Sequence, residues 1–103
     1  MFDPKTVVER NRTAKKEIED RIRFAQAVID KANADKEAML RDIEYAKQIA
    51  ILSESLAREY LAQGEREKAL QNLQKSLEIK KIVYDENDSE VIQLIKQIEV
   101  IKR

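Results

Sequence analysis

The fold of this chain is decided by residues 56–79, which read LAREYLAQGEREKALQNLQKSLEI. Gly64, the single glycine of the chain, divides this stretch into two parts. Glycine readily takes the left-handed backbone conformation that ends many helices. In both parts apolar residues recur at spacings of three and four, as in an amphipathic helix; they are Leu56, Ala57, Tyr60, Ala69, Leu70, Leu73 and Leu77. The stretch therefore predicts two helices joined by a tight turn at Gly64.

Capping signals divide the N-terminal half of the chain. Asp3 followed by Pro4 is typical of a helix start, because proline at the first helical position gives up no hydrogen bond. Residues 30–37 contain no large apolar residue. We expect Asn33 to end the first helix in the left-handed conformation and Asp35 to cap the second.

The C-terminal helix follows a run of polar residues, 85–89. Asn87 with Glu90 three residues later predicts a capping box at its start. The sequence thus predicts one all-α domain over residues 1–103, a four-helix antiparallel arrangement in which two long N-terminal helices pack on the helical hairpin. The expected helices lie near residues 4–32, 35–63, 65–84 and 88–102.

Apolar stripes along these helices indicate the expected core. The stripe of the first helix consists of Val7, Val8, Ala14, Ile18, Ile22, Ala25, Val28 and Ile29. The second half of the third helix continues its stripe with Ile79, Ile82 and Val83. We expect all of these side chains to be buried.

A second interpretation of the N-terminal half is a single helix from residue 4 to about residue 63. No glycine and, after Pro4, no proline interrupts this span. Such a rod would have to bury its apolar stripe against another copy of the chain, as coiled coils do. This alternative predicts a self-associating protein, whereas a turn at 30–37 predicts a monomer.

Composition excludes most kinds of chemistry. The chain has no histidine and no cysteine, which removes the commonest metal ligands and general bases. Its 20 Lys and Arg residues balance its 20 Asp and Glu residues, without the basic excess of a nucleic-acid-binding protein. We therefore expect no enzymatic activity, no metal or cofactor, no nucleic-acid partner and no membrane span, in a soluble cytoplasmic protein without a signal peptide.

The pattern of residues 48–100 resembles a tetratricopeptide repeat, a hairpin of two antiparallel helices. Ala57 and Ser76 stand where that family has small residues for close helix approach, and Tyr60 and Leu73 stand where it fills the space between its helices. The loop at residues 84–91 looks like that of the kinesin-light-chain variant, with Ser89 in place of the usual proline. The resemblance implies one repeat, whereas about three are normally stacked.

The resemblance also implies a candidate site, because tetratricopeptide arrays bind peptides along the first helix of each repeat. On this chain that face would present Glu54, Arg58 and Leu61. Family members that clamp a peptide carboxylate use cationic or amide side chains there, so we expect Glu54 to repel such a ligand.

Taken together, these features predict a designed or recombined helical scaffold whose property is folding, with no partner required. A peptide-binding or protein-binding module is the first alternative, and helical self-association is the second.

Overall fold

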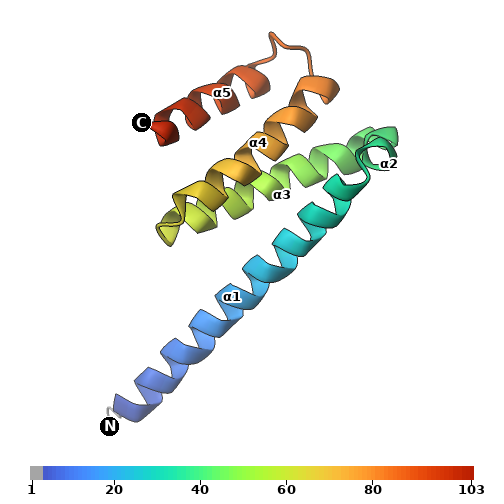
Figure 1. The fold of residues 1–103 in the computed structure, drawn as a ribbon. Helices are drawn as coiled ribbons and strands as arrows, with labels where there is room; N and C mark the ends of the chain where they lie inside the picture. Colours follow the sequence, from blue (N-terminus) through green and yellow to red (C-terminus); the bar gives the residue numbers. More distant parts are fainter. Residues whose placement is uncertain (1–3) are drawn as a thin grey trace.

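The structure, a computed structural model, describes residues 4–103 and their side chains from residue 12 onward. It is all-helical, and no strand occurs among the described residues. Figure 1 shows the five helices, α1 (Pro4–Ala34), α2 (Lys36–Arg41), α3 (Ile43–Ala62), α4 (Arg66–Val83) and α5 (Ser89–Lys102). The expectation of an all-α fold is confirmed, whereas four helices were expected and five are present.

The predicted hairpin is formed by α3 and α4. Gly64 has a φ of 77°, and the turn is closed by hydrogen bonds from the Gly64 N–H to the Leu61 carbonyl (3.0 Å) and from the Glu65 N–H to the Tyr60 carbonyl (2.8 Å). This pair of bonds is a Schellman motif, which satisfies the last carbonyls of a helix. Most of the apolar residues that predicted the hairpin are buried in its core, namely Leu56, Ala57, Tyr60, Ala69 and Leu73.

The predicted helix over residues 35–63 is wrong, because it breaks at Asp42. The backbone of Asp42 is extended (φ −110°, ψ 100°), and its carboxylate accepts a hydrogen bond from the Tyr45 N–H at 3.2 Å. An aspartate side chain that binds the backbone in this way competes with helix continuation. Asp42 therefore ends α2 and caps α3.

The turn at residues 30–37 is confirmed, but Asn33 does not form it. No described residue other than glycine has a positive φ, and the Asn33 amide donates to the Ile29 carbonyl within α1 at 2.8 Å. Asp35 caps α2 as predicted, by accepting from the Ala38 N–H at 3.1 Å. The single helix over residues 4–63 is therefore wrong, and the rod on which self-association depended is not formed.

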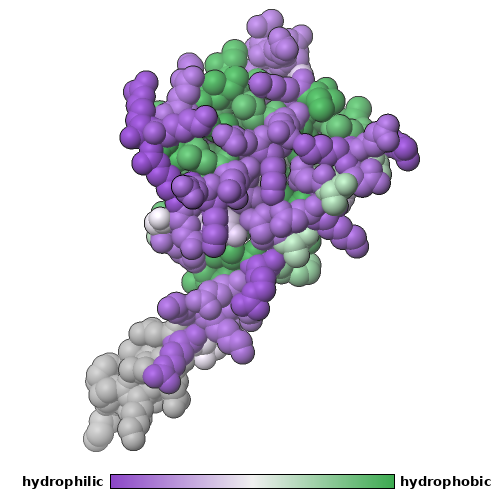
Figure 2. All heavy atoms as spheres, in the orientation of Figure 1, coloured by the Kyte–Doolittle hydropathy of each residue, from purple (hydrophilic) through white to green (hydrophobic). Residues whose placement is uncertain are grey.

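Among the side chains of α1 that the structure describes, the buried ones lie in its C-terminal half. Ile22 and Ile29 are buried in the core shared with α3, α4 and α5. Ala14 and Ile18, which were expected to be buried, are exposed, because α1 continues past the end of the hairpin (Figure 1). Val7 and Val8 lie outside the residues whose side chains are described. Figure 2 shows hydrophilic side chains covering the described part of this projection.

The last helix, α5, lies against α4 and buries Val91, Leu94 and Ile98. Its cap is Asp88, whose carboxylate accepts from the Glu90 N–H at 2.9 Å, and not Asn87 as predicted. Asn87 instead donates its N–H to the Asp85 carboxylate at 3.0 Å, inside the loop. Among the described residues no helix is long and apolar enough to cross a membrane.

Candidate functional site

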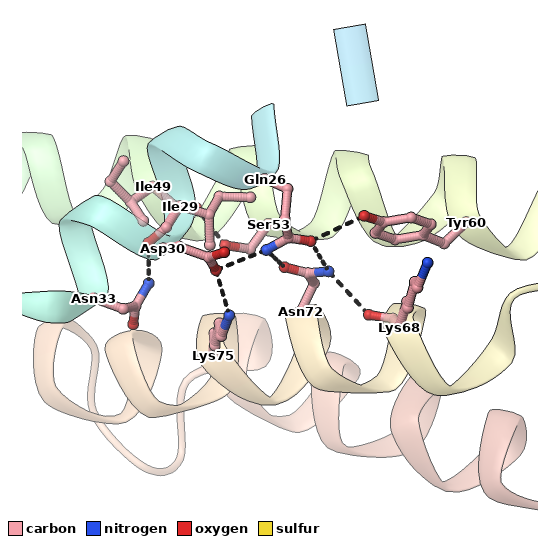
Figure 3. A network of polar contacts seen from close by, with 10 residues as sticks. All are labelled: Gln26, Ile29, Asp30, Asn33, Ile49, Ser53, Tyr60, Lys68, Asn72 and Lys75. Atoms are coloured by element: carbon pink, nitrogen blue, oxygen red, sulfur yellow. Dashed lines mark hydrogen bonds and ion pairs between the residues drawn. The ribbon is translucent and has the colours of Figure 1, made fainter. Parts of the chain in front are cut away.

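A network of polar side chains joins α1 to the hairpin (Figure 3). The Gln26 amide nitrogen donates to Asn72 Oδ1 (3.2 Å) and Asp30 Oδ1 (2.9 Å). The Gln26 amide oxygen accepts from Asn72 Nδ2 (3.0 Å) and from the Tyr60 hydroxyl (3.1 Å). Asn72 Nδ2 also donates to the Lys68 carbonyl at 2.9 Å. One side chain of α1 thus contacts both helices of the hairpin.

An ion pair extends this network toward solvent. Lys75 Nζ donates to Asp30 Oδ1 at 2.8 Å. The hydrogen bond from Lys75 lowers the pKa of Asp30 below its ordinary value, against the opposing effect of burial. Burial raises the pKa of the Tyr60 phenol above its ordinary value.

This network is a structural device rather than a reaction centre. Asn72 is 1% exposed, and both polar atoms of its side chain have partners. A buried amide with all its partners present stabilises one arrangement of the helices, because any shift leaves a polar group unsatisfied. The network therefore determines how α1 lies on the hairpin.

A second polar centre lies between α3, α4 and α5. Here a groove of about 250 Å³, called the α3 groove below, is lined by Lys47, Ile51, Glu54, Arg58, Lys80, Tyr84 and Glu90. The first four residues follow each other along one face of α3, since spacings of four, three and four repeat on one side of a helix. The α3 groove contains two of the three predicted contact residues, Glu54 and Arg58.

Lys80 forms the floor of the α3 groove. It is 5% exposed, and its Nζ donates to Glu54 Oε2 at 2.8 Å and to Glu90 Oε2 at 2.9 Å. Burial lowers the pKa of Lys80, but the hydrogen bonds that Lys80 donates to the two carboxylates outweigh this effect and raise that pKa above its ordinary value. Lys80 therefore stays charged and joins α3, α4 and α5.

Glu54, which we expected to repel an anionic ligand, has two partners inside the molecule. Glu54 Oε2 accepts from Lys80 and also from the Ser76 hydroxyl at 2.8 Å. Its side chain is only 17% exposed. Glu54 thus shares the positive charge of Lys80 with Glu90 and forms part of the wall of the groove.

The remaining predicted contact residues lie in different surroundings. Arg58 is exposed at one end of the α3 groove and makes no hydrogen bond or ion pair with a described residue. Leu61 does not line the groove, because it is half-buried against the apolar core that contains Leu56 and Leu73. The structure therefore brings Glu54 and Arg58 together and separates Leu61 from them.

Several residues of the α3 groove were not predicted from the sequence. Lys47 and Ile51 continue the Glu54 and Arg58 face toward the start of α3, so their spacing was an available signal. Lys47 Nζ lies 5.2 Å from the centre of the Tyr84 ring, a cation–π contact across the groove. Nothing in the local sequence of Tyr84 or Glu90 indicates this position, because it depends on the loop between α4 and α5.

The described residues contain no group of three Asp, Glu, His or Cys side chains able to hold a metal ion. Comparisons with protein-family models, with curated proteins and with solved structures found no match to this chain.

Proposed function

We propose that this chain is a protein-interaction module that binds a short extended peptide in the α3 groove, with an apolar residue of the peptide between two acidic ones. The resemblance of residues 48–100 to a tetratricopeptide repeat supports this proposal, since that family binds peptides along the equivalent helix.

The observation that carries the proposal is that some charged side chains of the groove have close partners and others do not. Glu54 has an ion pair with Lys80 and a hydrogen bond from Ser76, whereas Arg58 has no partner among the described residues. Lys47 Nζ makes a long ion pair of 3.9 Å with the exposed Glu44 and a cation–π contact with the Tyr84 ring, 5.2 Å from its centre. The groove therefore presents cationic groups at both ends.

An exposed apolar residue lies between these cations. Ile51 is 62% exposed, although it lines the groove. Such a residue offers apolar contact to a ligand without disturbing the core. The ligand that matches this surface has acidic ends and an apolar middle.

Helix geometry gives the spacing of the peptide. At ~1.5 Å per helical residue, Ile51 lies about 6 Å along α3 from Lys47 and about 10 Å from Arg58. An extended peptide advances about 3.3 Å per residue, so these distances correspond to roughly two and three peptide residues. The expected motif is acidic-x-apolar-x-x-acidic, or its reverse for the opposite chain direction.

The test is a titration of the isotope-labelled chain, followed by NMR, with the peptides Glu-Ser-Leu-Ser-Ser-Glu and Glu-Ser-Ser-Leu-Ser-Glu. One of them should shift the resonances of Lys47, Ile51 and Arg58 saturably, and the same peptides with lysine in place of glutamate should not. Arg58→Ala should weaken binding by roughly two- to fivefold, as expected for an exposed ion pair. Arg66→Ala, at an exposed position outside the groove, is the matched control.

The second candidate function is a scaffold that binds no ligand. The network in Figure 3 favours this candidate, since the polar groups of Gln26, Asn72 and Tyr60 form hydrogen bonds within the network. If neither peptide moves a groove resonance, the interaction proposal fails. The scaffold function, including a designed or recombined origin, is then the better account of the chain.

A further inference from the structure

A second pocket, separate from the α3 groove, lies where α1 ends and α2 crosses α4. Its volume is about 350 Å³, and its walls are almost wholly apolar. The residues that line this pocket, called the α2 pocket below, are Asn33, Lys36, Met39, Leu40, Glu78, Ile79, Lys81 and Ile82.

The floor of the α2 pocket is rigid and its rim is open. Met39 is 3% exposed and Ile79 is 2% exposed, and both belong to an apolar cluster with Ala46, Ile49 and Ala50. Ile82, which was expected in the core, is 64% exposed at the rim. A buried apolar floor with an exposed isoleucine beside it is a concave surface onto which an apolar ligand can pack from solvent.

The break at Asp42 explains why this pocket exists. In an uninterrupted helix over 35–63, residues 36–41 would continue along the axis of α3. The extended backbone of Asp42 redirects α2, so that Met39 and Leu40 form one wall of the pocket and Ile79 and Ile82 form the other.

One charged side chain at the α2 pocket has no partner among the described residues. Lys36 Nζ and Glu78 Oε2 form an ion pair of 2.7 Å that bridges α2 and α4. Lys81 is exposed, lines the pocket and makes no hydrogen bond or ion pair with a described residue. One positive charge is therefore left without a partner beside an apolar cavity, and it complements an anion.

The volume limits the size of the ligand. An engineered apolar cavity of about 150 Å³ holds one benzene ring. The α2 pocket has roughly twice that volume, which is enough for an alkyl chain of about ten carbons. We infer that the α2 pocket binds a small apolar monoanion, a medium-chain carboxylate, with its chain on Met39 and Ile79 and its carboxylate at Lys81. This inference does not depend on the peptide proposal, because the two sites share no lining residue.

The two methionines of the chain make the test specific. Met39 lies in the wall of the pocket, and Met1 is the only other methionine. In a sample with isotope-labelled methionine methyl groups, decanoate below its micelle concentration should shift the Met39 signal saturably and leave the Met1 signal in place. Octanoate and hexanoate should bind progressively more weakly, by up to about fourfold per methylene removed from the apolar surface.

Two variants test the two parts of the inference. Ile82→Glu places a carboxylate at the rim and should reduce decanoate affinity at least tenfold, whereas Val100→Glu, at a position of α5 that is 66% exposed, should not change it. Lys81→Gln should weaken decanoate by roughly two- to fivefold and leave the binding of uncharged decanol unchanged. Circular dichroism of each variant checks that the helices are intact.

Three results would overturn the inference: a Met39 signal that does not move, a Met1 signal that moves equally, or equal binding by Ile82→Glu and the original chain. A decanoate affinity that Lys81→Gln leaves unchanged, or lowers no more than the decanol affinity, would refute the role of Lys81 and hence the anionic ligand.

Discussion

Lys80 and Glu54 form the least exposed ion pair among the described residues, with Nζ and Oε2 2.8 Å apart and side chains 6% and 17% exposed. The two residues lie on different helices of the hairpin. A buried ion pair contributes little net stability, but its separation is costly because one charge is then left without a partner.

Glu54→Gln should therefore destabilise the chain by about 1–3 kcal/mol, because Lys80 loses its more buried partner and keeps only Glu90. Glu90→Gln should cost less than about 1 kcal/mol, since that carboxylate is 52% exposed. Urea unfolding followed by circular dichroism measures both. Equal losses would show that the burial of Glu54 has no energetic consequence.

The raised pKa of Lys80 gives this pair a pH dependence. A group whose pKa is higher in the folded state contributes stability below its unfolded pKa, and the contribution is lost as pH rises through the folded pKa. The stability difference between the original chain and Lys80→Met should therefore shift in favour of the variant at strongly alkaline pH. A difference that is constant with pH would contradict the ion pairs of Lys80.

Gln26→Ala should loosen α1, because the substitution removes partners from Tyr60 and from the buried Asn72. We expect a loss of about 1–3 kcal/mol and faster amide hydrogen exchange in the C-terminal half of α1 than in α3. Gln71→Ala, at an exposed position of α4, is the control and should change neither. Uniform acceleration in all helices would argue against a separate role for the network.

Asp30 should make stability fall at low pH. Its pKa is lowered in the folded state, chiefly by the hydrogen bond from Lys75. The contribution is therefore present above its ordinary pKa of 3.8 and is lost as pH falls through the folded pKa. Because Asp30 is 56% exposed, Asp30→Asn should cost only about 0.2–1 kcal/mol at neutral pH. The cost should vanish near pH 2, and urea midpoints at the two pH values test this.

Asp42→Ala distinguishes the observed fold from the one expected from sequence. In an uninterrupted helix, alanine would be a better helix former than aspartate and would stabilise the chain. With Asp42 as the cap of α3, the substitution should instead cost about 0.5–2 kcal/mol. A lower thermal midpoint in Asp42→Ala would support the cap at Asp42, and a higher one would support the uninterrupted helix.

Gly64→Ala should cost about 1–2 kcal/mol through the backbone alone, because φ is 77° and no atom lies within 4 Å of the added methyl group. Leu73→Ala, at a fully buried position, should cost about 2–5 kcal/mol. The denaturation midpoints of the two variants test whether Leu73→Ala is the more destabilising. An unchanged midpoint for Gly64→Ala would show that the turn tolerates another backbone conformation.

Much of the secondary structure could be predicted from the sequence because its signals are local. The glycine turn involves contacts within five residues, between Tyr60 and Glu65, and the cap at Asp35 spans three residues. The break at Asp42 could not be predicted in this way. Aspartate also occurs on exposed helix faces, and here the packing of Met39 in the apolar cluster of α1, α3 and α4 accompanies the redirection of α2.

The candidate site was only partly predictable. The tetratricopeptide resemblance placed Glu54 and Arg58 on one face of a helix, but it did not show that Lys80 pairs with Glu54. It also placed Leu61 on that face, whereas Leu61 is half-buried against the apolar core and does not line the groove.

The sequence by itself determined the all-helical class, the turn at Gly64 and the start of α2, because each depends on backbone preferences within a few residues. The tertiary structure alone decided the position of α1, through the burial of Ile22 and Ile29 in the core and the hydrogen bond between Gln26 and Asn72, 46 positions apart. It also decided the burial of Lys80 and the opening of the α2 pocket. These features depend on which side chains meet across helices, and that pairing is a property of the packed molecule rather than of any local segment.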